Sequence, residues 1–181
     1  MHTRDEILEA LDRMQSESAA YWSAFSAEEF FAKIGTAWSP AENVRHLAKS
    51  IRPVTKALRL PRFVLLLMFG APRRDSISYE ALRERYRGKL AAGGEAGRFA
   101  PSSQAVLDRE AVLALQTSAN GELRAAIARW PEAALDRRQL PHPLLGKLTV
   151  REMLFFTLYH QQHHIDVVKR RLAEAAATPA G

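Results

Sequence analysis

The stretch 149-TVREMLFFTLYHQQHHIDVVKRRLAEA-175 decides the fold of this chain. Its first residues, Thr149 to Glu152, have the T-x-x-E pattern of a capping box, which predicts that a helix begins there. At 1.5 Å per residue, a helix of about 27 residues is about 40 Å long. Such a helix is long enough to form one full side of a helical bundle.

Three further helices are predicted by apolar residues at helical spacing. The second of these begins at Ser39, where Pro40 suits the first helical position and Glu42 completes another capping box. We find no credible strand pattern, so the sequence predicts an all-α four-helix bundle in a single domain, residues 1–181. The three further helices are expected at residues 3–24, 39–58 and 103–129.

Residues 71–105 are predicted to form a surface insertion between helices two and three. The insertion contains a helix-capable segment, SYEALRERYRG, and then a Gly- and Pro-rich loop at residues 91–105 that is long enough to act as a flap. Just before it, the apolar run FVLLLMFG at residues 63–70 is too short to span a membrane. We expect this run to form a buried turn of helix or the contact of a homodimer.

The composition limits which residues can bind a metal and which partners the protein can have. The chain contains no cysteine, so any metal site must use His, Asp, Glu or water. The net charge of +6 is scattered along the chain, and no nucleic-acid reading motif is present, so we expect no nucleic-acid partner. The charge weakly favours anionic small molecules. The N-terminus lacks a secretory signal and predicts a cytoplasmic protein.

Three of the six histidines lie close together in the last helix. At about 100° per residue, His164 lies about 40° from His160 on the buried side, whereas His163 lies about 60° the other way and should point away from the pair. Histidines at i and i+4 can reach one metal ion, although a hydrogen-bonded core pair or a solvated helix face would show the same pattern.

A third histidine, His46, borders the apolar stripe of the second helix. A buried imidazole requires a partner. A backbone carbonyl could provide that partner, and so could a metal ion shared with His160 and His164.

Two segments together resemble the DinB/YfiT-like superfamily of four-helix-bundle metalloproteins. They are WSPAENVRHL at residues 38–47 and HPLLGKLTVREMLFFTLYHQQHHIDVV at residues 142–168. The resemblance implies that His46, His160 and His164 are the ligands of a divalent ion such as zinc or nickel, with water completing the coordination, and that His163 is not a ligand. It implies neither polymerase activity nor DNA binding.

Three functions remain open. The first is a metal-dependent transferase that uses a low-molecular-weight thiol, as in similar family members. The second is a hydrolase in which the metal activates water, and the third is a helical bundle that binds a partner without catalysis. A metalloprotease is disfavoured because Gln161 stands where the zincin motif has its glutamate. Apart from the metal's own water or thiol, the polar candidates near the site are Asn43, Tyr159 and Gln161.

Overall fold

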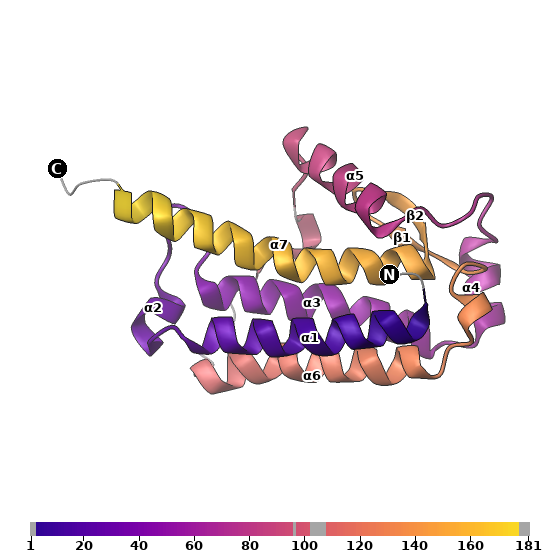
Figure 1. Ribbon diagram of the computed structural model, residues 1–181, viewed down its shortest axis with the longest axis horizontal. Coiled ribbons are helices and arrows are strands. Elements are labelled where there is room, and N and C mark those ends of the chain that lie inside the picture. Colours follow the sequence, from indigo (N-terminus) through magenta and orange to yellow (C-terminus); the bar gives the residue numbers. More distant parts are fainter. Residues whose placement is uncertain (1–2, 96, 102–107, 178–181) are drawn as a thin grey trace.

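Four long helices form the bundle that the sequence predicts (Figure 1). The computed structural model describes residues 3–95, 97–101 and 108–177. The bundle helices are α1 (Arg4–Ser23), α3 (Pro40–Arg59), α6 (Arg109–Ala128) and α7 (Val150–Ala177).

Helices α1 and α3 occupy opposite corners of the bundle. Each of them packs against both α6 and α7. In Figure 1, α1 and α7 run in one direction while α3 and α6 run in the other. Helix α7 therefore lies antiparallel to α3, and its histidines face the helix that carries His46.

Capping boxes start three of the bundle helices, α1, α3 and α7. In the box of α7, the Thr149 backbone N–H donates to Glu152 Oε2 at 2.8 Å, and the Glu152 N–H donates to Thr149 Oγ1 at 3.1 Å. Glu152 also accepts from Arg74 Nη2 at 2.9 Å and from the Ile77 backbone N–H at 2.8 Å. The carboxylate that starts α7 therefore also fixes the first part of the insertion. The other capping boxes are Thr3 with Glu6, Ser39 with Glu42, and Ser26 with Glu29 at the short helix α2 (Ala27–Phe31).

The prediction that the chain has no strands is wrong. Strands β1 (Gln139–His142) and β2 (Gly146–Thr149) form an antiparallel hairpin directly before α7. Each strand has only four residues and β1 contains a proline, so neither is long enough to show a clear alternating pattern. Gly146 has a φ of 74°, a value that glycine adopts without strain at the turn.

The start of α6 also differs from the prediction. Asp108 caps this helix by accepting from the Ala111 N–H at 2.7 Å. Helix α6 then begins at Arg109, and the short helix η2 (Glu132–Ala134) follows it. The predicted start at residue 103 falls on residues 102–107, which lie outside the described residues.

The segment between α3 and α6 contains α4 (Arg62–Phe69), α5 (Tyr79–Ala91) and the short helix η1 (Gly97–Phe99). Helix α5 packs against α7 on the outside of the bundle (Figure 1). Helix α4 buries Leu65 but leaves Phe63, Leu67 and Met68 63%, 79% and 59% exposed. The homodimer expected from this apolar run stays a prediction. Among the described residues, no helix has both the length and the apolar character of a membrane span.

Candidate metal centre

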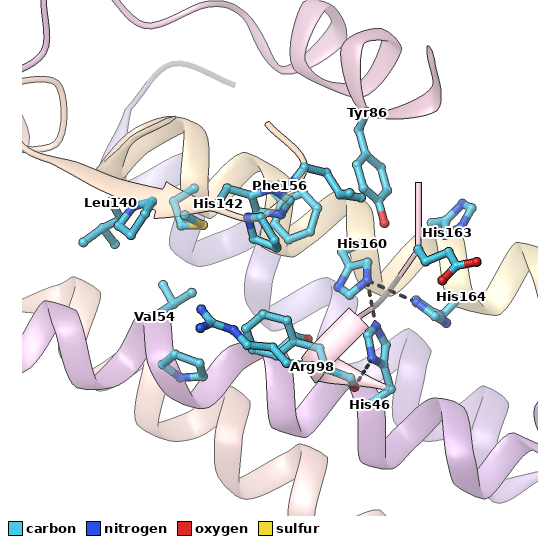
Figure 2. Close-up of a pocket in the computed structure, with 18 of the residues that line it drawn as sticks. His46, Val54, Tyr86, Arg98, Leu140, His142, Phe156, His160, His163 and His164 are labelled. Carbon is cyan, nitrogen blue, oxygen red and sulfur yellow. Dashed lines mark hydrogen bonds between the residues drawn. The ribbon is translucent and has the colours of Figure 1, made fainter. Parts of the chain in front are cut away.

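Three imidazole rings converge between α3 and α7 (Figure 2). His160 Nε2 lies 3.1 Å from His46 Nε2 and 3.1 Å from His164 Nε2. One ligand atom from each ring falls in a group whose members all lie within 4.8 Å of one another. The three side chains are buried, with exposed fractions of 3%, 6% and 8% for His46, His160 and His164.

Hydrogen bonds to the outer nitrogens fix two of the rings. His46 Nδ1 lies 2.8 Å from the Phe99 carbonyl oxygen, which can only accept, so this nitrogen carries the proton. His164 Nδ1 donates in the same way to Asn43 Oδ1 at 2.7 Å. The Asn43 amide is itself oriented because its Nδ2 donates to the Ser39 carbonyl at 2.8 Å. In their neutral forms, His46 and His164 therefore turn unprotonated Nε2 atoms toward the centre.

These nitrogens cannot all satisfy one another. A proton on His160 Nε2 could be donated to His46 or to His164, but not to both in good geometry. At least one buried lone pair would then lack a donor, which is costly. Burial also lowers the pKa of all three rings and disfavours the cationic form that could supply more protons. Three converging neutral imidazoles are instead the donor set that a divalent cation requires, so the residues fit the metal that the sequence predicts.

Aromatic rings hold the histidines in place. The Trp38 ring is stacked on His164, with centroids 6.1 Å apart and planes 6° apart. The Phe156 ring is stacked on His160, with centroids 4.9 Å apart and planes 22° apart. Among the described residues, none forms a hydrogen bond with His160 Nδ1, so this packing orients its ring. The site combines fixed nitrogens with an apolar surround.

A cavity of about 360 Å³ opens beside the histidines. All three of them line it, and Figure 2 shows the chamber continuing along α3 and α7 toward Val54 and Leu140. Arg98 and Glu95 lie at its exposed edge. A molecule in this chamber can therefore reach the histidine nitrogens.

Residues of the insertion line the cavity beside the histidines. Tyr86 and Leu90 of α5 line the cavity, together with Phe99 of η1. The Phe99 carbonyl also accepts the His46 bond, and Lys49 Nζ donates to the Ala100 carbonyl at 2.9 Å. The part of the predicted flap that the structure describes thus forms one wall of the site.

Asn43, Tyr159 and Gln161 lie in different surroundings. Asn43 bonds directly to His164, as described above. The Tyr159 ring lies 6.1 Å from that of Tyr86, on the side of α7 that faces α5. Gln161 is fully buried on the other side, where its Oε1 accepts from Gln116 and Asn120 of α6. Gln161 is not among the residues that line the cavity.

His163 lies outside the group of three nitrogens, but it borders the same cavity. Its ring centroid is 5.5 Å from that of His164 and 5.9 Å from that of Tyr86. We expected His163 to point away from the pair. Helix α5 packs over the face of α7 that carries His163, and its Tyr86 contacts the His163 ring. His163 therefore borders the cavity although it lies outside the group of three nitrogens.

Two buried polar residues of the cavity wall, Tyr86 and His142, are not expected from the sequence. Both are buried, with exposed fractions of 6% and 8%. Tyr86 lies in the helix-capable part of the insertion, and His142 lies shortly before the predicted last helix. A tyrosine amid arginines and a histidine between two prolines carry no signal of a site, because only the folded insertion and hairpin bring them to α7.

The fold and the three converging histidines define a four-helix bundle with a candidate metal site. The sequence model of the DinB superfamily matches residues 10–168, so the chain belongs to this superfamily. No curated protein matches the chain significantly.

Two solved structures share the fold. One is TT2238, described as a four-helix bundle protein, with 21% identity, a TM-score of 0.60, and coverage of 93% of this chain and 99% of that one. The other is YfiT from Bacillus subtilis, described as a probable metal-dependent hydrolase with an unusual four-helix bundle topology. It has 17% identity, a TM-score of 0.61, and coverage of 97% of this chain and 89% of that one.

Proposed function

We propose that this protein is a metal-dependent enzyme that transfers a small thiol to an electrophilic substrate. The observation that carries the proposal is the convergence of three neutral imidazole nitrogens on the wall of an apolar cavity. His46, His160 and His164 would hold the ion, and zinc or nickel suits three nitrogen ligands. A site that served only to stabilise the fold would not need to face a chamber of this size.

The chain's own residues prepare the centre for this chemistry. Asn43 and the Phe99 carbonyl hold two rings in the tautomer that leaves Nε2 unprotonated. With three neutral ligands, a bound divalent ion retains its full charge and supplies the Lewis acidity that makes a water or a thiol nucleophilic near neutral pH.

Tyr86 supplies a proton donor next to these rings. Its ring centroid lies 6.1 Å from that of His160, and Figure 2 shows its hydroxyl directed toward the histidine cluster. Burial raises the pKa of Tyr86 to about 12, so the hydroxyl keeps its proton at neutral pH. It can donate a hydrogen bond to negative charge that develops on a substrate atom during the reaction.

Arg98 favours a thiol that carries carboxylates. It is exposed at the edge of the cavity, where its guanidinium can pair with an anionic group of a molecule whose sulfur reaches the centre. The second candidate is a metal-dependent hydrolase, which the description of the YfiT neighbour favours. Both reactions would use the same nitrogens and the same donor at Tyr86.

The test is an activity screen on protein purified without a histidine tag. The protein is loaded with zinc or nickel and assayed with thiol-plus-electrophile pairs, and in parallel with ester and amide substrates without thiol. We expect thiol consumption that stops with a chelator and returns with metal. Turnover without thiol would establish the hydrolase instead.

Two variants test the separate roles of Tyr86 and Arg98. Tyr86→Phe removes only the hydroxyl and should lower kcat while metal content stays unchanged. Arg98→Ala should raise KM for a carboxylate-bearing thiol and leave kcat nearly unchanged. A metal-loaded protein that is inert in every assay would leave a non-catalytic binding bundle.

A further inference from the structure

The hairpin before α7 holds one imidazole in a fixed tautomer. His142 Nδ1 accepts from the Leu144 backbone N–H at 3.2 Å and from the Leu145 N–H at 3.1 Å. A nitrogen that accepts two N–H groups carries no proton of its own, so the neutral ring must carry its proton on Nε2. Burial, with the nearby charge of Arg85, lowers the pKa of His142 to about 4 and keeps the ring neutral at physiological pH.

This Nε2–H has no hydrogen-bond partner among the residues that the structure describes. His142 is only 8% exposed, and the surface that remains faces the cavity it lines. Its ring lies against Phe156, with centroids 4.2 Å apart, and its centroid is 6.4 Å from that of Tyr86. The Nε2–H is therefore free to donate a hydrogen bond to an acceptor atom inside the cavity, whether of water or of a ligand.

The position of His142 relates it to the metal centre. The Phe156 ring is stacked on His160 and also contacts His142. A single phenyl group therefore separates the His142 donor from His160, one of the predicted metal-binding residues. The chamber wall near His142 is mainly apolar, with Leu140, Leu144 and Met153 among the lining residues and the Tyr86 ring nearby. A ligand that fills this part of the cavity must be mainly apolar and needs one acceptor atom.

We propose that this end of the cavity is a subsite for an apolar substrate, and that His142 Nε2–H donates a hydrogen bond to a neutral acceptor on it, such as a carbonyl oxygen. His142 is thus a positioning residue that sets how the substrate lies relative to the histidine centre. The inference deepens the proposed function, since it names the chemical class of the electrophile. Its test relies on binding alone and needs neither turnover nor metal.

Two substitutions separate the two nitrogens of this ring. His142→Asn places an amide oxygen near the position of Nδ1, so it can still accept from the hairpin turn, but it has no group at the position of Nε2. His142→Gln places an amide N–H near the position of Nε2 and loses the acceptor of the turn. The first variant should lose the donor to the ligand, and the second should retain it.

The probes are acetophenone and ethylbenzene, which share a phenyl ring and differ by a carbonyl oxygen. Their dissociation constants are measured by NMR titration on metal-free protein, and the readout is the preference for the ketone over the hydrocarbon. Because a net hydrogen bond contributes about 0.5–1.5 kcal/mol, His142→Asn should lower this preference about two- to twelvefold, whereas His142→Gln should keep most of it. Using a ratio cancels any general change in cavity shape.

The wild-type protein gives a second readout that needs no variant. Acetophenone should shift the resonance of the His142 Nε2–H proton downfield, and ethylbenzene should not. The proposal is overturned if neither probe binds the cavity, if the ketone leaves this proton unshifted, or if a folded His142→Asn variant keeps the full preference. A protein that binds acetophenone through His142 but catalyses nothing would refute the proposed enzyme and leave the subsite intact.

Discussion

On one side of α7, His160 and His164 face the cavity, whereas on the other side Gln161 faces α6. All three residues lie within two turns of one helix and are buried. Gln161 Oε1 accepts from Gln116 Nε2 at 3.1 Å and from Asn120 Nδ2 at 2.9 Å. In this amide cluster, donors meet acceptors, although Gln161 Nε2 and Asn120 Oδ1 have no partner among the described residues.

The histidine cluster has the opposite balance, because unprotonated nitrogens meet at its centre. Both clusters bury polar atoms, so burial alone does not distinguish them. The atoms that meet at the centre distinguish them. Amide N–H donors that meet an acceptor oxygen support the fold, while converging nitrogen lone pairs require a cation.

The largest effect should come from metal removal. A ligand present at about 1,000 times its dissociation constant stabilises the folded state by about 4 kcal/mol, so a chelator should lower the free energy of unfolding by that amount. Chemical denaturation with and without zinc measures the change. Gln161→Ala should show the same metal-dependent difference, and His164→Ala should show almost none. Equal stability of the wild-type protein with and without metal would remove the contrast between the clusters.

A smaller effect is expected at Asn43. Asn43→Ala removes the acceptor that orients His164, and loss of such a partner typically lowers metal affinity about 10- to 100-fold. Asn43→Asp keeps an acceptor at the same position and should retain most of the affinity. Competition with a chromophoric chelator measures both constants. An alanine variant with wild-type affinity would show that the His164 ring needs no such support.

Acid should distinguish the clusters in the metal-free protein. Burial lowers the pKa of His46, His160 and His164 in the folded state, so below about pH 6.5 the unfolded chain binds protons that the folded chain does not. The contribution of these histidines to the free energy of unfolding is therefore fully present above that pH and is lost as the pH decreases. Each such histidine contributes a slope of about 1.4 kcal/mol per pH unit.

Denaturation at pH 7, 6 and 5 measures this slope. His160→Ala should reduce it by the contribution of one histidine, while Gln161→Ala should leave the slope unchanged because amides do not titrate. The assignment of neutral buried imidazoles fails if the wild-type stability is flat across this range.

The amide cluster should have the smallest effect on metal binding. Gln161→Ala removes the shared acceptor of two buried amides, which should cost about 1–3 kcal/mol of folding free energy. Metal content at matched folding should remain that of the wild-type protein. A large loss of metal in this variant would mean that the two sides of α7 are not independent.

The bundle could be predicted from sequence because its signals are local. Capping boxes such as Thr149 with Glu152 mark where helices begin, and apolar periodicity marks their buried faces. The hairpin was missed because its strands are short and one contains Pro141. A four-residue strand gains its stability from its partner strand and from α7, and these contacts are not visible in the local sequence.

The candidate site divides in the same way. His160 and His164 could be recognised as a pair because i and i+4 share a helix face, and the family resemblance added His46. Tyr86 and His142 reach the cavity only after α5 and the hairpin fold onto α7. Their positions depend on contacts between segments far apart in the chain, and no periodicity records those contacts.

The most direct test of the three-histidine centre is metal content in four alanine variants. Protein purified without a histidine tag is loaded with zinc, desalted and analysed by elemental mass spectrometry at matched folding. We predict that His46→Ala, His160→Ala and His164→Ala each lose most of the metal, because each lacks one of the three converging nitrogens, and that His163→Ala keeps most of it. Loss of the metal in His163→Ala, together with retention in His164→Ala, would contradict the assignment of the site.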